Sequence, residues 1–306
     1  MRLGIIGLGR MGSNMALRLL RGKHAVIAFD REKRAVRGLA RKGAVPARSL
    51  EELVKKLPSP RAIWLMLPAG PATDSTVEGL AALLSPGDMI VDGSNGRWTQ
   101  DAPRAERLAR CGIRCMDAGV SGGVWGLKNG YCLMLGGEKK DFRRIEPALK
   151  TLAPKDGYLL AGPAGAGHYS KMIHNGIEYG MMQSYAEGFS LLESSPLGLD
   201  LHALARLWNR GSVVRSWLLE LVEHALAKDP SLSRLRACVS DSGEGRWTVQ
   251  DAVEQGVAAP VIALSLFQRF SSREKNSFGD RLLAALRSEF GGHAVQKAAS
   301  ASRRRR

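Results

Sequence analysis

The chain opens with Arg2-Leu-Gly-Ile-Ile-Gly7-Leu-Gly9-Arg-Met-Gly12-Ser-Asn-Met-Ala-Leu17, an apolar strand that runs into a glycine-rich turn and then into an amphipathic stretch. Gly7 permits the tight turn, Gly9 lets a pyrophosphate approach the backbone, and Gly12 lets the helix pack closely on the strand. The N-terminus of that helix then faces the phosphates. This order of strand, turn and helix predicts a dinucleotide-binding Rossmann unit. The residues expected to contact the cofactor here are Gly7, Leu8, Gly9, Arg10, Met11 and Gly12.

A second apolar strand, Ala25-Val-Ile-Ala-Phe29, ends in Asp30, close to the distance expected for the acid that binds the ribose. Its carboxylate can accept hydrogen bonds from a 2′-hydroxyl group and would repel a 2′-phosphate, so it favours NAD. Arg31 could instead pair with a 2′-phosphate, or it could be a solvated charge at a helix start. NAD is therefore the predicted cofactor, and NADP stays the alternative.

Further strands are expected along the N-terminal half, with helical stretches between several of them. The candidates are residues 62–67, 89–92, 113–117 and 131–135. This alternation predicts an α/β fold class, an N-terminal Rossmann domain built on a doubly wound, mostly parallel sheet.

The strand pattern ends at Gly162-Pro-Ala-Gly-Ala-Gly167, and the chain after it reads as helices. The predicted division is a dinucleotide-binding domain over residues 1–164 and an all-α domain for substrate binding and oligomerisation over 165–297. Residues 298–306 are expected to form a disordered basic tail.

The chain of 306 residues carries a formal net charge of +16, and four of those charges are the arginines at 303–306. Such an excess of positive charge could bind nucleic acid or attract anionic substrates and cofactors. No nucleic-acid module is visible, so a nucleic-acid partner is not favoured. No apolar run approaches membrane-spanning length, which predicts a cytoplasmic protein without a membrane partner.

The four cysteines are expected to be reduced and structural. They are Cys111, Cys115, Cys132 and Cys238. Their spacing has no paired zinc-ligand pattern, so no metal site is predicted.

One stretch carries a polar stripe, because Lys171, His174, Asn175 and Glu178 fall at i, i+3, i+4 and i+7 of a helix. The apolar residues around them predict a buried helix whose polar groups point together into a cleft. A base, an acid and two hydrogen-bonding groups would then line up there. The alternative is a structural role, in which these polar side chains only form hydrogen bonds at the contact between packed helices.

Two loops after predicted strands carry further polar residues. Asp92-Gly-Ser-Asn95 and Val120-Ser121-Gly122-Gly123 lie where the carboxyl ends of a parallel sheet place a ligand. The glycine N–H groups of the second loop suit an anionic ligand. Ordinary turns are the alternative for each loop taken alone.

From these residues the chain resembles the decarboxylating 6-phosphogluconate dehydrogenases, and more closely their short, NAD-preferring branch within the β-hydroxyacid dehydrogenase superfamily. The likeness runs from residue 1 to about residue 297. Its most specific part is Gly165-Ala-Gly-His-Tyr-Ser-Lys171-Met-Ile-His174-Asn175-Gly-Ile-Glu178-Tyr179-Gly.

The resemblance implies that Lys171 is the general base and Glu178 the general acid. It also implies two sets of contacts. Those with substrate are Asn95, Ser121, Gly122, Gly123, His174, Asn175 and Tyr179, and those beside the cofactor are Leu67, Pro68, Ala69 and Asn95.

Two later segments extend the resemblance. Arg269 in Ala263-Leu-Ser-Leu-Phe-Gln-Arg269 is similar to the arginine that holds the substrate phosphate. Arg287-Ser-Glu-Phe-Gly-Gly-His293 is similar to the segment that completes a neighbouring subunit's site, which implies a homo-oligomer, a dimer or tetramer, with shared active sites. Without the resemblance, Arg269 could be a snorkelling surface residue and His293 the neighbour of a helix cap.

The chain also departs from the long members of the family. Those members carry lysine and threonine where Ser242 and Glu244 stand here, and Val124-Trp125 replaces a pair of acids. The segment Gly243-Glu-Gly-Arg-Trp-Thr248 resembles another phosphate-side segment of the family, and the departures bear on how it would contact a phosphate. They fit the short branch.

The resemblance implies oxidative decarboxylation of 6-phosphogluconate to ribulose 5-phosphate and CO2, with hydride transfer to NAD. Lys171 must be neutral to accept the hydroxyl proton, and lowering a lysine pKa by about 3 units destabilises its charged form by about 4 kcal/mol. A simple 3-hydroxyacid dehydrogenase is one alternative, although it would not need Glu178, Tyr179 and Arg269. A non-catalytic protein that binds dinucleotide or nucleic acid is another, and it would not need the polar stripe.

Overall fold

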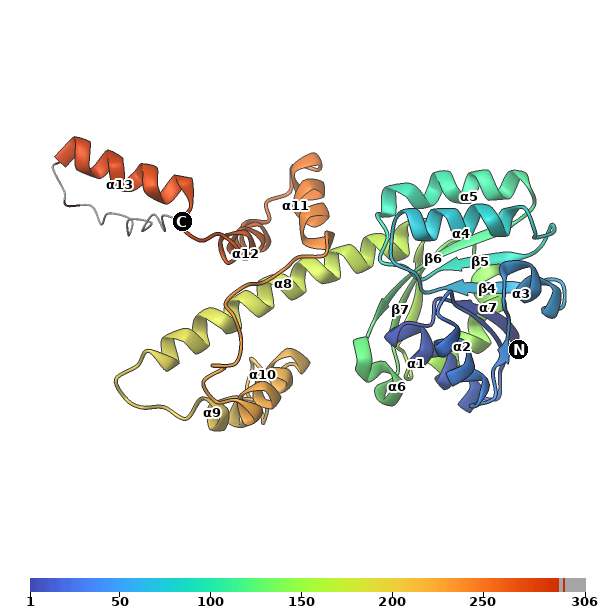
Figure 1. The fold of residues 1–306 in the computed structure, drawn as a ribbon, viewed down its shortest axis with the longest axis horizontal. Helices are drawn as coiled ribbons and strands as arrows, with labels where there is room; N and C mark the ends of the chain where they lie inside the picture. Colours follow the sequence, from blue (N-terminus) through green and yellow to red (C-terminus); the bar gives the residue numbers. More distant parts are fainter. Residues whose placement is uncertain (292–293, 295–306) are drawn as a thin grey trace, which may run out of the picture. The chain divides into compact units, whose positions relative to one another are not determined.

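The computed structural model describes residues 1–291 and residue 294, so the predicted basic tail at 298–306 lies outside the described residues. Its N-terminal part is an eight-stranded sheet in the order β3-β2-β1-β4-β5-β6-β7-β8 (Figure 1). The strands are β1 (Arg2–Ile6), β2 (Ala25–Phe29), β3 (Val45–Pro46), β4 (Ala62–Leu65), β5 (Met89–Asp92), β6 (Arg114–Ser121), β7 (Cys132–Gly136) and β8 (Tyr158–Gly162). The strand order reverses between β1 and β4, and open α/β sheets bind ligands at the carboxyl ends of the strands at such a point.

The predicted α/β class and doubly wound, mostly parallel sheet are confirmed, and one pair of strands is antiparallel. Strands β1 to β6 are parallel, whereas β7 runs antiparallel to β6, and β8 pairs parallel with β7. The reason is the short connection between β6 and β7, which holds only the short helices η2 (Gly123–Trp125) and α6 (Gly126–Asn129). A parallel crossover needs about a dozen residues or more, so this link reverses the chain instead.

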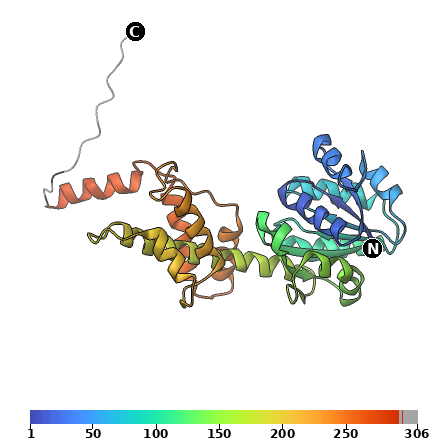
Figure 2. The same cartoon turned by 90° about the horizontal axis from the view of Figure 1, so that it is seen from below.

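Helices cover both faces of the sheet (Figures 1 and 2). On one face, α1 (Arg10–Arg21), α2 (Lys33–Ala40) and α7 (Lys139–Leu152) bury residues such as Met15, Leu39 and Leu149. On the other face, α3 (Leu50–Lys56), α4 (Pro71–Ala81) and α5 (Asp101–Arg110) bury Leu53, Leu80 and Leu108. Because the sheet is buried on both sides, its strands are almost continuously apolar.

A 28-residue helix, α8 (Ala166–Glu193), follows the last strand. It begins directly after Gly165, whose φ of 96° favours glycine. The regular elements described after it are all helices, which confirms the all-α prediction for this part of the chain. They are α9 (Leu201–Trp208), α10 (Trp217–Lys228), α11 (Glu244–Glu254), α12 (Pro260–Ser271) and α13 (Phe278–Gly291). None of the helices in the described residues is long and apolar enough to cross a membrane.

The chain forms two compact units. The first unit comprises Met1–Met182 together with Gly243–Ile262, and the second comprises Gln183–Ser242 together with the chain from Ala263 on. The sheet does end near the predicted boundary at residue 164, but the division between the compact units falls within α8. The second unit has a small core of its own, in which Ala205, Leu219 and Leu226 are buried.

The prediction that the helix around Lys171 has no exposed face is wrong for the single chain. Met172 is buried, but Ile177 has a relative exposure of 52% and Met182 of 43%. The face that is buried carries Gly167, Lys171, Asn175 and Tyr179. The apolar residues on the other side of α8 therefore remain uncovered in one chain.

Candidate active site

The turn between β1 and α1 has the backbone that its glycines predict. Gly7 has a φ of 91°, and a Cβ on Gly12 would overlap the Gly7 carbonyl oxygen. A Cβ on Gly9, in contrast, would meet nothing within 4 Å. Gly7 and Gly12 are thus needed for the turn and the packing of α1, while Gly9 leaves open space beside the backbone, as a closely approaching pyrophosphate requires.

Helix α1 begins at Arg10 behind Gly9, which provides no side-chain cap. The first N–H groups of a helix have no partner within it and attract anions. At the end of β2, Asp30 Oδ2 accepts a hydrogen bond of 2.5 Å from the N–H of Leu8, and Asp30 Oδ1 accepts one of 2.7 Å from Glu32. Arg31 beside it is exposed. The acid predicted to bind the ribose thus lies against the glycine turn, and these residues fit a dinucleotide.

The polar stripe on α8 forms one connected group. Lys171 Nζ donates a 2.7 Å hydrogen bond to Asn175 Oδ1 and lies 3.3 Å from His174 Nδ1. His174 Nε2 lies 3.3 Å from Ser121 Oγ, at the carboxyl end of β6. Lys171, His174 and Asn175 of the predicted stripe therefore lie together, and Ser121 from the predicted loop lies beside them.

Burial lowers the pKa of both basic side chains in this group. Lys171 is buried, and desolvation lowers the pKa of its amine, while the negative charges of Glu178 and Glu244 oppose that shift. Burial also lowers the pKa of His174, and the nearby charge of Lys171 adds to the effect. Both shifts favour the neutral forms, which can accept a proton.

Glu178 lies at the open end of the stripe. Its Oε2 is 3.8 Å from His174 Nδ1, and both side chains are about 40% exposed. A half-exposed carboxyl group can exchange protons with solvent. The predicted base and the predicted acid thus differ in environment, one buried and one accessible.

Two glycines for which no contact was predicted, Gly119 and Gly167, bring α8 against the sheet. A Cβ on Gly119 of β6 would lie 2.5 Å from Lys171 Cβ and 2.6 Å from the Gly167 carbonyl oxygen. A Cβ on Gly167 would overlap the backbone carbonyl of Met134 on β7. The close approach of bare backbone to bare backbone places Lys171 at the carboxyl end of β6.

The two predicted loops lie at the same edge of the sheet. Gly122 and Gly123 have φ values of 134° and 52°, and a Cβ on Gly123 would meet nothing within 4 Å. Asn95, in the loop after β5, is exposed, and its Nδ2 donates a hydrogen bond to Oε1 of the buried Glu244. Glu244 stood out in the sequence only as a departure from the family pattern, and its contact with Asn95, 149 residues away, was not predicted.

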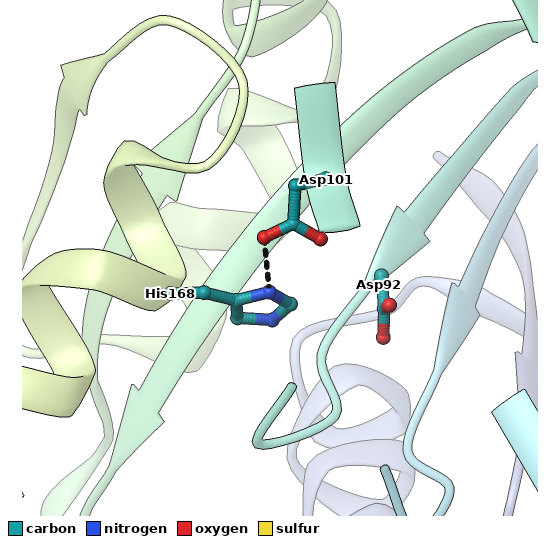
Figure 3. Close-up of side chains that lie close together, drawn as sticks. All are labelled: Asp92, Asp101 and His168. Atoms are coloured by element: carbon teal, nitrogen blue, oxygen red, sulfur yellow. Dashed lines mark hydrogen bonds and ion pairs between the residues drawn. The ribbon is translucent and has the colours of Figure 1, made fainter. Parts of the chain in front are cut away.

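A buried charge cluster holds the start of α8, and no sequence motif indicated it. Asp117 on β6 accepts hydrogen bonds from the N–H groups of Gly165, at 2.7 Å, and His168, at 2.8 Å. His168 Nδ1 lies 2.8 Å from Asp101 Oδ2, which Figure 3 shows together with Asp92. Burial opposes the charging of His168, but the hydrogen bond and charge of Asp101 outweigh it and raise the pKa of His168 to about 9.

Ligand atoms of Asp92, Asp101 and His168 lie within 4.8 Å of one another, as in a metal site. The cluster already contains a cation, because Arg104 Nη1 lies 2.5 Å from Asp92 Oδ2 and 3.5 Å from Asp101 Oδ1. The arrangement is therefore that of an internal ion-pair network that anchors α8 and α5 to the sheet.

The remaining predicted residues lie in several places. Leu67, Pro68 and Ala69 follow the end of β4 after one intervening residue, at the point where the strand order reverses. Tyr179 is buried on α8, where a Cβ on Gly245 would lie 2.5 Å from its ring.

Arg269, predicted to hold the substrate phosphate, and Arg287, predicted to complete a neighbouring site, both belong to the second unit. Arg269 Nη1 donates a 3.1 Å hydrogen bond to the Ser240 carbonyl, and Arg287 is exposed on α13. His293 lies outside the described residues. Contacts of these three with substrate stay predictions.

Comparison with known proteins agrees with this architecture. Residues 2–161 match the NAD binding domain of 6-phosphogluconate dehydrogenase, and residues 167–303 match its C-terminal domain. A Haloferax volcanii protein named 6-phosphogluconate dehydrogenase, NAD(+)-dependent, decarboxylating, is 44% identical over 299 residues, which cover 97% of this chain and 99% of the relative.

Solved structures give the same result. The Plasmodium falciparum 6-phosphogluconate dehydrogenase, solved apo, with NADP+ and with 6-phosphogluconate, has a TM-score of 0.83 at 27% identity, covering 98% of this chain and 67% of that one. A Mycobacterium tuberculosis 3-hydroxyisobutyrate dehydrogenase, with a TM-score of 0.70 at 24% identity over 86% of this chain and 90% of that one, shares the fold. Because both domain matches agree with a relative that aligns over nearly the full length of both chains, the chain belongs to the 6-phosphogluconate dehydrogenase family.

Proposed function

We propose that this protein catalyses the oxidative decarboxylation of 6-phosphogluconate to ribulose 5-phosphate and CO2, with NAD as the hydride acceptor. The observation that supports it most is the buried amine of Lys171, hydrogen-bonded to Asn175 and grouped with His174 and Ser121. This group lies at the carboxyl end of the parallel strands, the edge at which the glycine turn would hold a dinucleotide. The name of the Haloferax volcanii relative supports the same reaction.

The residues suit the two proton transfers that the reaction needs. The neutral amine of Lys171 accepts the proton of the 3-hydroxyl group, and burial favours that neutral form because it lowers the pKa of the amine. When bound, the nicotinamide supplies the hydride acceptor. During loss of CO2, Lys171 returns its proton to the carbonyl oxygen, and Glu178 then protonates carbon 1 of the enediol. The accessible position of Glu178 supports this second role, because its proton must be renewed at each turnover.

We also infer a preference for NAD over NADP. The carboxylate of Asp30 lies at the end of β2 and against the glycine turn, where it would repel a 2′-phosphate. Arg31 is exposed beside it and is the residue through which NADP could still be accepted.

The protein is further proposed to act as a homo-oligomer with shared active sites. Uncovered apolar side chains on α8, α12 and α13 support this, because large exposed apolar surfaces mark protein interfaces. Among them are Ile177, Met181, Leu264, Phe267, Leu283 and Leu286. A neighbouring subunit would contribute Arg287 and His293, and Arg269 would bind the substrate phosphate.

The test is a paired assay of NAD reduction and CO2 release with 6-phosphogluconate. We expect equal amounts of both products, with ribulose 5-phosphate as the sugar formed. 3-Hydroxyisobutyrate serves as the comparison substrate, since a simple 3-hydroxyacid dehydrogenase would reduce NAD without releasing CO2. Turnover of that compound alone would reject the proposal.

A further inference from the structure

Glu244 is a carboxylic acid buried inside the first unit. It is the first residue of α11, and its relative exposure is 4%. The positive end of the helix dipole stabilises an acid in the first turn, which explains how the fold tolerates it. The dipole does not explain the direction of the side chain, which reaches the loop after β5.

The contact with Asn95 fixes the orientation of an amide. Asn95 Nδ2 donates to Glu244 Oε1. Because the amide nitrogen donates to Glu244, the carbonyl oxygen at the other side of the planar amide faces away from it. An asparagine beside a hydroxyl group would have no such constraint, because a hydroxyl group both donates and accepts.

Asn95 is exposed, so its second end is available to a ligand. Its Oδ1 offers a hydrogen-bond acceptor at the edge of the sheet where Lys171 lies. An acceptor suits a hydroxyl group and repels the oxygens of a carboxylate or a phosphate.

We propose that Glu244 is a positioning residue that decides what Asn95 recognises: by holding the amide nitrogen, it leaves the Asn95 carbonyl oxygen to accept a hydrogen bond from a hydroxyl group of the sugar acid. The inference rests on the proposed function, which supplies such a substrate. Asn95 then orients the polyol part of the substrate, and the anionic groups are bound elsewhere.

The charge of Glu244 also acts on Lys171. The groups that influence the Lys171 amine are His174 and Glu178 from α8, Cys132 from β7 and Glu244 from α11. The negative charge of Glu244 raises the pKa of Lys171 against the lowering caused by burial. Glu244 therefore acts on both Lys171 and Asn95.

The first experiment exchanges donor and acceptor between the two residues. Asn95→Asp sets two carboxylates against each other and should lower kcat/KM for 6-phosphogluconate about 10- to 100-fold. Adding Glu244→Gln lets the glutamine amide donate to the new carboxylate, whose second oxygen still accepts. The double variant should therefore recover at least about tenfold over Asn95→Asp alone.

The second experiment measures the pH profile of Glu244→Gln alone. Loss of the negative charge lowers the pKa of Lys171, so the acid limb of kcat/KM should move to lower pH by roughly 0.5 to 1 unit. Glu254→Gln, on the exposed end of the same helix, is the matched control and should leave the profile unchanged.

Turnover by the wild-type enzyme is measured first, and its absence would reject the proposed function. If the wild type turns over but the Asn95→Asp/Glu244→Gln double variant has no higher kcat/KM than Asn95→Asp, the proposed role of the Asn95 oxygen is rejected. If the acid limb of the kcat/KM profile lies at the same pH in Glu244→Gln and Glu254→Gln, the proposed effect of Glu244 on the pKa of Lys171 is rejected. Thermal unfolding of each variant confirms that the proteins compared are folded.

Discussion

The proposed first step requires the amine of Lys171, because this amine is the base that accepts the hydroxyl proton. Lys171→Met keeps the apolar stem and removes the amine, so turnover should fall by about 10² to 10⁴ while NAD binding stays intact. Steady-state kinetics and a titration with NAD measure the two effects, with the exposed Lys150→Met as control. In the wild type, kcat/KM should rise as pH rises through the lowered pKa of Lys171. Near-normal turnover of Lys171→Met would show that the polar stripe on α8 is structural and not catalytic.

Asp30 has two roles that two substitutions can separate. Asp30→Ala removes the repulsion of a 2′-phosphate and should move the ratio of kcat/KM for NAD over NADP toward NADP by about tenfold or more. It also removes the acceptor of the Leu8 N–H, so efficiency with NAD should fall. Asp30→Asn retains an acceptor for that N–H and should shift the ratio with a smaller loss. An unchanged ratio in both variants would indicate Arg31 instead.

At the scale of elements, the contact of α8 with β6 is the most sensitive. Gly119→Ala places a methyl group 2.6 Å from the Gly167 carbonyl oxygen, and backbone cannot move aside as a side chain can. We expect a loss of about 1 to 3 kcal/mol in the free energy of unfolding and a lower kcat, because Lys171 moves with its helix. Gly38→Ala on α2, where a Cβ meets nothing within 4 Å, is the control and should be neutral or stabilising. Equal stability of the two variants would contradict this packing.

The sequence predicted those elements whose apolar runs are long and bounded by turns. Strands β2 and β5 have the predicted bounds, and the glycine turn leads into α1 as expected. The two-residue β3 was missed because it is too short to carry a pattern, and β8 because its residues are only partly buried. The antiparallel direction of β7 follows from its short connection to β6, and the apolar pattern of the strand itself does not indicate its direction.

The candidate site was predictable where one helix carries it. Lys171, His174 and Asn175 are neighbours by helical periodicity alone. The Asn95–Glu244 contact and the Asp101–His168 contact each form only through tertiary packing. Their partners are 149 and 67 residues apart in the sequence, so no local spacing could reveal them. The exposed far side of α8 was misjudged because an apolar face can be buried by a partner as well as by the same chain.

At the scale of the whole molecule, the shared site can be tested by complementation. Lys171→Met and Arg287→Ala subunits should each be inactive or nearly so, yet a mixture should regain activity. One composite site in a mixed oligomer can draw its lysine and its arginine from different subunits. Subunit exchange is verified with differently tagged chains. Exchanged subunits that recover no activity would count against sharing, and a fully active monomer would exclude it.

Stability of the whole fold should depend on the buried His168. Its pKa is about 9 in the folded protein against 6.5 for an ordinary histidine. Its stabilising contribution is therefore complete below pH 6.5 and is lost as pH rises toward about 9, by on the order of 3 kcal/mol. Denaturant unfolding across this range should give a steeper decline for the wild type than for His168→Gln. The exposed His224→Gln is the control, and identical slopes for wild type and His168→Gln would contradict the assignment.

The same buried pair makes folding a reaction that consumes hydrogen ions. Between pH 6.5 and about 9, His168 is largely uncharged in the denatured chain and charged beside Asp101 in the native one, so each molecule takes one proton from the buffer as it folds. The heat measured on melting then includes the ionisation heat of that buffer. Calorimetry in Tris and in phosphate at one pH should accordingly give different unfolding enthalpies for one and the same structure.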